Sequence, residues 1–411
     1  MSVKKAAELS QNTERSDKVM DADFFRKAIK EARHRFSVPT MLLRAAGNDH
    51  NLRMKMLEFI DVLPALCSSR EVCERFIMLI APHRHKLPSF LKYGSYIFSV
   101  PLFEGVASRV TRWIVYEKLA PYFIVTGGET LASLKELYRS EGARISVDFL
   151  GELVTSDREA SHFLELYCSA IQAHEGEGEP LHISVKLSSL YPFFGPENYN
   201  ESKRVVSQSL AKILQLAQKH NAFITVDAEQ YAFRHLVEDI FCDTISDERF
   251  KGLEHVGIAL QAYRKDSLRS ASRLVAVARS RGTPFTIRLV KGAYWDTEVA
   301  LAEQNNWPTP LFVKKHETDE HFKRVFAFLA AHWGIVYVSP ATHNPESIAH
   351  AYNLMNELGR FPDKHFTFQV LYGLGEPVRK ALCQMRLPVL VYTPVGAIEG
   401  GMAYFARRIL E

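Results

Sequence analysis

The segment Phe285-Thr286-Ile287-Arg288-Leu289-Val290 runs directly into Lys291-Gly292-Ala293-Tyr294-Trp295. The first six residues form a largely apolar run that predicts a buried strand. Arg288 lies inside this run and Lys291 at its end, where a buried charge requires an anionic or strongly polar partner. Gly292 lets the backbone approach a flat ligand, and the two aromatic residues offer faces for stacking. The segment therefore predicts a strand that ends in a ligand-binding loop.

Seven further apolar runs of this kind occur after residue 140, and helical patterns separate them. They cover residues 144–149, 182–187, 223–227, 257–261, 335–338, 366–371 and 388–392. Eight strand–helix units of this total length predict an α/β fold, a closed parallel (βα)8 barrel of the TIM type. A doubly wound sheet is the alternative, but the Gly-x-Gly-x-x-Gly fingerprint does not follow the first strands.

The first third of the chain has a different pattern. Residues 1–18 are polar and mixed in charge, which predicts a disordered tail. Residues 19–139 carry helical patterns and no strand signals, which predicts an N-terminal all-α arm, followed by the barrel in residues 140–411. Residues 90–113 are rich in aromatic side chains; core packing within the arm is the favoured interpretation, and a partner surface is the alternative.

Composition excludes several classes of function. A formal net charge of +4 over 411 residues is too small to indicate a nucleic-acid-binding protein. The five cysteines are scattered and form no Cys-x-x-Cys pair, which favours free thiols in a reducing compartment and predicts no metal site. No apolar run is long enough to span a bilayer.

Polar residues stand at the ends of nearly all the predicted strands. They are Asp148, Lys186, Asp227, Gln261, Arg288 with Lys291, His343, Gln369 and Tyr392. In a barrel of this type these ends meet at one face, so a shared site is expected there. In the last predicted helix Tyr404, Arg407, Arg408 and Glu411 share one face, and paired guanidinium groups suit a carboxylate.

Several motifs in the same order identify a family resemblance. They are the run 289–295, Ala341-Thr342-His343-Asn344, Phe368-Gln369-x-Leu371-x-Gly373-x-Gly375-Glu376-Pro377, Tyr392-x-Pro394-Val395-Gly396 and Arg407-Arg408 with Glu411. Together they resemble the proline dehydrogenase domain of the bifunctional proline utilization A (PutA) flavoproteins. The resemblance implies a distorted barrel that binds FAD and oxidises L-proline to Δ1-pyrroline-5-carboxylate, the first step of proline catabolism to glutamate. It also implies hydride transfer from proline C5 to flavin N5 and electron transfer to a membrane quinone.

The resemblance assigns roles residue by residue. Lys186, Arg407 and Arg408 are expected to hold the proline carboxylate, and Glu152 to pair with Arg407. Asp227 is expected near the substrate. Tyr294, Leu371 and Tyr392 are expected to wall the pyrrolidine ring, and Tyr392 implies proline rather than 4-hydroxyproline. The expected FAD contacts are Gln261, Arg288, Val290, Lys291, Gly292, Ala293, Trp295, Thr342, His343, Asn344 and Glu411. No residue is an obvious general base.

The chain departs from the bifunctional relatives in one respect. It ends at Glu411 and has no aldehyde dehydrogenase half, so a pyrroline-5-carboxylate dehydrogenase, separate or fused, is an expected partner. The expected location is cytoplasmic, with peripheral contact at the inner face of the membrane. Two alternatives remain: another FAD-binding barrel of the methylenetetrahydrofolate reductase type, and a non-catalytic interaction module derived from the dehydrogenase.

Overall fold

Eight parallel strands close into a barrel, with each strand pairing with the next in chain order and β8 pairing with β1. The computed structural model describes residues 20–32, 49–87, 89–151, 153–174, 178–398 and 401. The strands are β1 (Ala143–Phe149), β2 (Leu181–Val185), β3 (Ala222–Val226), β4 (Val256–Gln261), β5 (Thr286–Val290), β6 (Tyr337–Ala341), β7 (Phe368–Leu371) and β8 (Val389–Val395). The predicted (βα)8 barrel is confirmed, and the alternative of a doubly wound sheet is wrong.

The strand pairing is uneven around the barrel. Along β1 and β8 the pairing runs from Ala143 opposite Val389 to Phe149 opposite Val395. Between β6 and β7 the only pair in the described ladder is Ala341 with Gln369. The barrel is therefore distorted at β6 and β7.

The sixth strand begins later than the sequence indicates. The apolar run predicts a strand over residues 335–338, whereas β6 covers Tyr337–Ala341. The backbone N–H groups of Ile335 and Val336 instead donate to the carbonyl of His332, which closes the turn after the preceding helix. Val336 is part of the apolar core and Ile335 packs against it, so the apolar run predicts a strand that begins too early and ends too early.

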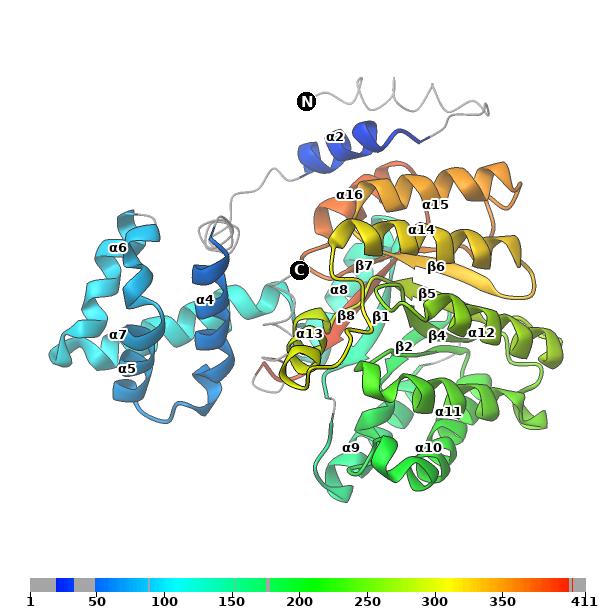
Figure 1. Ribbon diagram of the computed structural model, residues 1–411, viewed down its shortest axis with the longest axis horizontal. Helices are drawn as coiled ribbons and strands as arrows, with labels where there is room; N and C mark the ends of the chain where they lie inside the picture. The colour runs from blue at the N-terminus through cyan, green and yellow to red at the C-terminus, as the bar shows by residue number, and fades with distance from the viewer. Residues whose placement is uncertain are drawn as a thin grey trace.

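Helices surround the barrel, as Figure 1 shows. They are α8 (Gly128–Ser140), α9 (Asp157–Gln172), α10 (Tyr199–Lys219), α11 (Arg234–Ser246), α12 (Ser267–Arg281), α13 (Trp295–Gln304), α14 (Lys315–Ala331), α15 (Pro345–Glu357) and α16 (Glu376–Gln384). Apart from α13, their buried faces and the strands form one continuous apolar core. This core fixes the strand ends, and hence the polar side chains that they carry.

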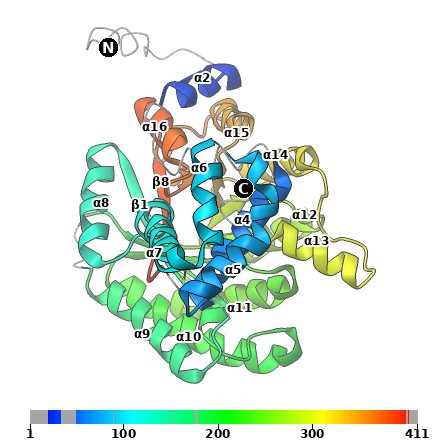
Figure 2. The same ribbon diagram turned by 90° about the vertical axis from the view of Figure 1, so that its left-hand side faces the viewer.

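A group of helices before the barrel forms the arm. Its helices are α4 (His50–Val62), α5 (Ser69–Leu79), α6 (Ser89–Gly94) and α7 (Glu104–Trp113), which a π-helix over Ile114–Leu119 extends. They enclose a second apolar core, against which Leu150 and Tyr392 of the barrel also pack. Figure 2 shows the arm in front of the ring of barrel helices. The arm therefore covers part of the face where β1 and β8 end.

The aromatic-rich segment of the arm is largely exposed. Leu102 is 85% exposed, Tyr93 71% and Trp113 54%. On α7 the buried side chains are small, namely those of Ala107, Ser108 and Thr111, and larger apolar side chains point outward. The favoured interpretation, core packing of residues 90–113, is therefore wrong for these exposed side chains.

Helix α2 (Ala22–Ala32) lies on the barrel rather than on the arm helices (Figure 1). It packs against α15 and α16, and the side-chain amide of Asn353 bonds both the backbone N–H and the carbonyl of Met20, at 2.6 and 3.1 Å. An ion pair between Arg26 and Glu346 adds a polar contact at the same junction.

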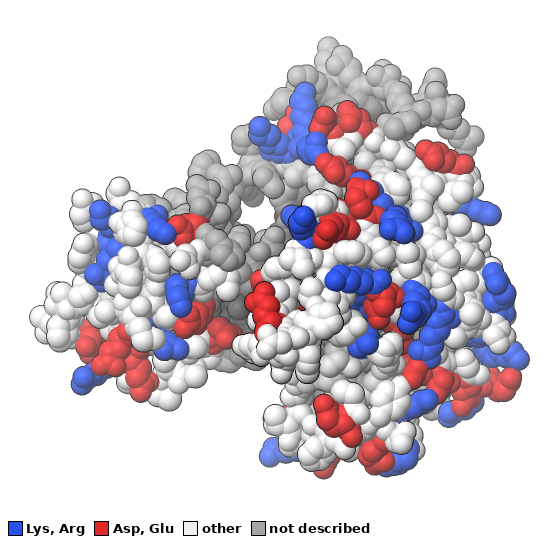
Figure 3. All heavy atoms as spheres, in the orientation of Figure 1, with Lys and Arg blue, Asp and Glu red and all other residues white. Residues whose placement is uncertain are grey.

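The surface carries charges of both signs. Figure 3 shows Lys and Arg side chains interspersed with Asp and Glu over the visible barrel helices. Among the described helices, none is both long enough and apolar enough to cross a bilayer. All five cysteines are free thiols.

Candidate active site

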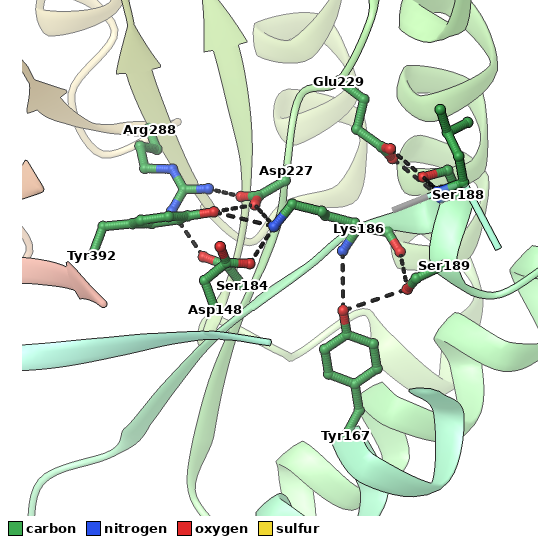
Figure 4. Close-up of polar contacts among 11 residues, drawn as sticks. Asp148, Tyr167, Ser184, Lys186, Ser188, Ser189, Asp227, Glu229, Arg288 and Tyr392 are labelled. Atoms are coloured by element: carbon green, nitrogen blue, oxygen red, sulfur yellow. Dashed lines mark hydrogen bonds and ion pairs between the residues drawn. The ribbon is translucent and has the colours of Figure 1, made fainter. Parts of the chain in front are cut away.

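Six polar side chains from five strands or strand ends meet inside the barrel (Figure 4). Asp148 comes from β1, Ser184 from β2, Lys186 from the residue after β2, Asp227 from the residue after β3, Arg288 from β5 and Tyr392 from β8. All except Tyr392, which is half-buried, are almost fully buried. The predicted gathering of strand-end residues is therefore present for this set.

The inward direction of these side chains follows from strand geometry. Side chains alternate between the two faces of a strand, so Ser184 and Lys186, two residues apart, point the same way. Asp148 stands opposite Ser184 in the pairing of β1 with β2. Tyr392 stands opposite Ser146 in the pairing of β1 with β8. Neighbouring strands therefore bring these polar groups to the same end of the barrel interior.

The ammonium group of Lys186 has three partners. It donates to the Asp148 carboxylate and forms an ion pair with it. Its Nζ lies 3.3 Å from the hydroxyl oxygen of Tyr392 and 3.4 Å from Oδ2 of Asp227. An ammonium group has three N–H donors, so these three acceptors match its capacity.

Asp227 links Lys186 to Arg288. One carboxylate oxygen accepts from the Arg288 guanidinium, and the other accepts from the Tyr392 hydroxyl at 2.7 Å. A second guanidinium nitrogen of Arg288 donates to the Ser184 hydroxyl at 2.9 Å. The guanidinium carbon of Arg288 lies 5.0 Å from the centre of the Tyr392 ring, a distance at which a cation–π attraction operates.

The buried charges of this cluster balance. Two cations, Lys186 and Arg288, face two carboxylates, Asp148 and Asp227. Burial is the largest single influence and lowers the pKa of Lys186, but Asp148, Tyr392 and Tyr167 together outweigh burial and hold this pKa well above its ordinary value. Lys186 is therefore an ammonium ion throughout the neutral pH range.

Further hydrogen bonds hold the strand ends in place. The Glu229 carboxylate accepts from the backbone N–H of Ser188 at 3.1 Å and from its hydroxyl. The amide of Gln261 donates to the Glu229 carbonyl at 2.9 Å. The Ser188 hydroxyl accepts from the backbone N–H of Leu153, a non-glycine residue with a φ of 55°. These bonds connect the ends of β2, β3 and β4 to the loop after β1.

The loop that follows β5 carries most of the expected cofactor contacts. Val290 ends β5, Trp295 begins α13, and Lys291, Gly292, Ala293 and Tyr294 lie between them. Lys291 forms an ion pair with Asp319, and burial lowers its pKa although Asp319 opposes the shift. The Trp295 indole N–H donates to the Phe312 carbonyl at 3.0 Å.

Gly292 lies against a protein ring. A Cβ atom at this position would come within 2.5 Å of the Tyr263 ring, and the φ of Gly292 is 136°. The sequence predicts that this glycine admits a flat ligand. The described structure places a flat aromatic side chain there, so the glycine has a structural requirement independent of any cofactor.

The expected contacts after β6 surround the start of α15. Asn344 caps this helix, because its side-chain oxygen accepts from the Ser347 backbone N–H at 3.0 Å. The Thr342 hydroxyl accepts from the Asn344 backbone N–H at 3.1 Å. His343 Nε2 accepts from the Leu371 backbone N–H at 2.9 Å, which joins this loop to the end of β7.

Four expected site residues lie outside the described residues: Glu152, Arg407, Arg408 and Glu411. Gly401, just before this last segment, is described and buried. A Cβ atom there would come within 2.4 Å of Ile124 and 2.7 Å of Leu150. Close packing between the arm and the barrel is a physical reason for a glycine at this position.

Three residues around the site received no role from the sequence. The sequence marks Asp148 only as a strand-end residue, and it singles out neither Glu229 nor Ser184. Strand alternation could have indicated Ser184, because it precedes Lys186 by two positions. The pairing of Asp148 with Lys186 has no local signal, since 38 residues separate them. Among the described residues, no group of three or more His, Cys, Asp or Glu side chains could hold a metal ion.

Comparison with known proteins places this site in a family. The model of the family described as proline dehydrogenase matches residues 130–411, and that of the proline utilization A N-terminal domain matches residues 14–111. The bifunctional protein PutA of Escherichia coli K12 is 30% identical over 307 residues, which cover 70% of this chain and 23% of that protein. Proline dehydrogenase 2 of Bacillus subtilis 168 is 30% identical over 292 residues, which cover 70% of this chain and 85% of that protein.

A solved structure agrees with these matches. Proline utilization A from Bdellovibrio bacteriovorus, inactivated by N-propargylglycine, superposes with a TM-score of 0.80 at 28% identity. The superposition covers 95% of this chain and 40% of that one, so the chain spans less than half of this relative. The expected resemblance is confirmed: with a barrel of eight parallel strands and a family match over more than half of its length, the chain belongs to the proline dehydrogenase family.

Proposed function

We propose that this chain oxidises L-proline to Δ1-pyrroline-5-carboxylate, with FAD as its flavin. The observation that carries the proposal is the cluster of Lys186, Asp227, Arg288 and Tyr392 at the strand ends, within the segment that matches the proline dehydrogenase family. The alternative of a methylenetetrahydrofolate reductase type gains no support from this match.

The donors near β4, β5 and α15 fit a flavin. Arg288 is buried and cationic, and it would stand near the ring edge where negative charge develops, with Gln261 as a neighbouring donor. Thr342, His343 and Asn344 surround the N-terminus of α15, and helix N-termini suit phosphate groups. Lys291 would add a cation on the same side, and the remaining contacts would come from Val290, Gly292, Ala293, Trp295 and Glu411. The bound flavin would supply the acceptor for the hydride from proline C5.

The protein side chains would orient proline. Lys186 would bind the carboxylate together with Arg407 and Arg408, because several cations around one carboxylate give strong and directed binding. Tyr294, Leu371 and Tyr392 would wall the pyrrolidine ring, and the bulk of Tyr392 would disfavour 4-hydroxyproline. Asp227 would hold the Tyr392 hydroxyl and Arg288 in place, and Glu152 would pair with Arg407.

The wider context belongs to the same proposal. The electrons would pass to a membrane quinone, and a pyrroline-5-carboxylate dehydrogenase, separate or fused, would consume the product. Peripheral membrane contact would follow from that acceptor, and the location that we propose is cytoplasmic. The domain division that we propose is a tail over 1–18, a helical arm over 19–139 and the barrel over 140–411.

An anaerobic titration with L-proline tests the proposal. The purified chain is loaded with FAD, and the flavin absorbance is followed as proline is added. We expect the absorbance to bleach with saturation, and the Lys186→Met variant to need a much higher proline concentration. If the chain does not retain FAD, or retains it without reduction by proline, the proposed function is wrong.

A further inference from the structure

We infer that Asp148 is a positioning residue that fixes Lys186 as an ammonium ion for an incoming carboxylate. This inference rests on the proposed function, because the carboxylate is that of the amino-acid substrate. Asp148 itself is fully buried at the end of β1, and it acts through Lys186.

The contacts of Lys186 divide into one strong and two weak ones. Its ion pair with Asp148 is buried on both sides, with 7% and 0% of the two side chains exposed. The distances to the Tyr392 hydroxyl and to Asp227, 3.3 and 3.4 Å, lie at or beyond the long end of the hydrogen-bond range. A substrate carboxylate can therefore replace either of the two weak contacts while Asp148 keeps the lysine in place.

The other two acceptors of Lys186, Tyr392 and Asp227, have shorter hydrogen bonds to other partners. Asp227 bonds the Arg288 guanidinium and accepts from Tyr392 at 2.7 Å. Asp148 has no such second hydrogen bond. Its other carboxylate oxygen is also buried, and it has no hydrogen-bond partner among the described residues. Asp148 is therefore the carboxylate that serves Lys186, whereas Asp227 serves Arg288.

The charged and polar groups around Lys186 determine how the loss of the Asp148 charge changes the pKa of Lys186. Among the residues that the structure describes, the groups that face it are Asp148, Tyr167 from α9, Asp227, Tyr392 and, beyond Asp227, Arg288. In the Asp148→Asn variant the amide oxygen still accepts a hydrogen bond, but within the described cluster two cations, Lys186 and Arg288, then face one carboxylate, Asp227. Burial and the nearby guanidinium both favour a neutral lysine, so the pKa of Lys186 falls.

The test is the binding of cyclopentanecarboxylate, which has the carboxylate and ring of proline but no amine that titrates. Calorimetry at pH 8.5, in two buffers of different ionisation enthalpy, measures the protons taken up on binding. We expect none for the FAD-loaded wild type. For Asp148→Asn we expect uptake approaching one proton and affinity weakened roughly tenfold.

Control variants separate this role from a purely structural one. Tyr167→Phe alters the hydrogen bond to the backbone N–H of Lys186 but not the ammonium group, so binding there should remain free of proton uptake. Asp148→Glu restores the charge and should reduce the uptake. In a Lys186→Met background, Asp148→Asn should cause no uptake and no further tenfold loss, because a residue that acts through Lys186 cannot act without it.

The outcomes are distinct. Loss of proline-dependent flavin reduction in the wild type overturns the proposed function. Reduction in the wild type, combined with no proton uptake in a folded Asp148→Asn variant, overturns the role of Asp148. If Asp148→Asn does not fold, Asp148→Glu is measured in its place, with Lys186 and with Lys186→Met. A loss of affinity that occurs only when Lys186 is present supports the role, and an equal loss in both backgrounds overturns it. Uptake that persists in the Lys186→Met background contradicts it.

Discussion

Substitution of Gly292 can show whether the fold itself or a bound cofactor requires a glycine at this position. Its φ of 136° is unfavourable for any residue with a Cβ atom, and its missing Cβ leaves room for the Tyr263 ring. The Tyr263 ring is 2% exposed, and its backbone N–H donates to the Lys291 carbonyl at 2.8 Å, which ties the two segments together. The ring therefore has little freedom to move away from an added methyl group.

The Gly292→Ala variant should lose stability for two reasons. The backbone conformation costs about 1–3 kcal/mol for a non-glycine residue. The contact at 2.5 Å with the Tyr263 ring adds about 1–3 kcal/mol of overpacking. We expect the free energy of unfolding to fall by about 2–6 kcal/mol in the chain without added flavin.

Gly334 provides a matched control. Its φ is 91°, and a Cβ atom there would meet nothing within 4 Å. Gly334→Ala should therefore show the backbone cost alone. The excess cost of Gly292→Ala over Gly334→Ala, about 1–3 kcal/mol, measures the clash with Tyr263.

Urea unfolding followed by far-UV circular dichroism gives both values, and a double variant completes the cycle. In a Tyr263→Ala background the excess cost of Gly292→Ala should disappear. If the excess is absent without flavin and appears only when flavin is bound, the glycine serves the cofactor alone and the Tyr263 ring does not require it.

Three further outcomes are expected. Tyr392→Phe removes the 2.7 Å bond to Asp227, and kcat/KM for proline should fall about 10–100-fold in steady-state assays; an unchanged value would remove the hydroxyl from the site. Burial lowers the pKa of His182 from 6.5 to about 3, so between these values only the unfolded chain binds this proton, and the free energy of unfolding decreases as the pH is lowered. When the pH is lowered from 7 to 5, urea unfolding of His182→Phe should therefore show a decrease in this free energy that is about 2 kcal/mol smaller than that of the wild type. Arg379→Met removes the two hydrogen bonds that the buried Arg379 donates to Glu376, and the free energy of unfolding in the same assay should fall by about 2–4 kcal/mol. An unchanged value would show that the pair does not stabilise the fold.

Much of the fold could be predicted because its signals are local. Apolar runs such as 285–290 and the helical patterns between them depend on neighbouring residues only, and eight of them favour a closed barrel. The same local order placed Lys186 and Asp227 at strand ends and Arg288 within a strand. Local signals failed for β6, where the partly buried Ile335 and the buried Val336 lie in a turn rather than in a strand.

The arm shows a second kind of failure. Aromatic and apolar residues over 90–113 predict a packed core, because the sequence does not tell which face of a helix is covered. In the structure small residues form the buried face of α7, and Trp113 lies on the exposed one. Only the packing of α5 against α7 decides this choice.

By itself, the sequence determined the order of strands and helices, the strand-end position of the chemical groups and, through its motifs, the family. The tertiary structure alone decided which groups meet. Lys186 faces Asp148 because β1 and β2 pair side by side, and Arg288 reaches Asp227 across β4, which lies between β3 and β5, because both side chains point into a closed barrel. Gly292 faces Tyr263 for the same reason. Such contacts join residues far apart in the chain, and their geometry is set only when the barrel closes.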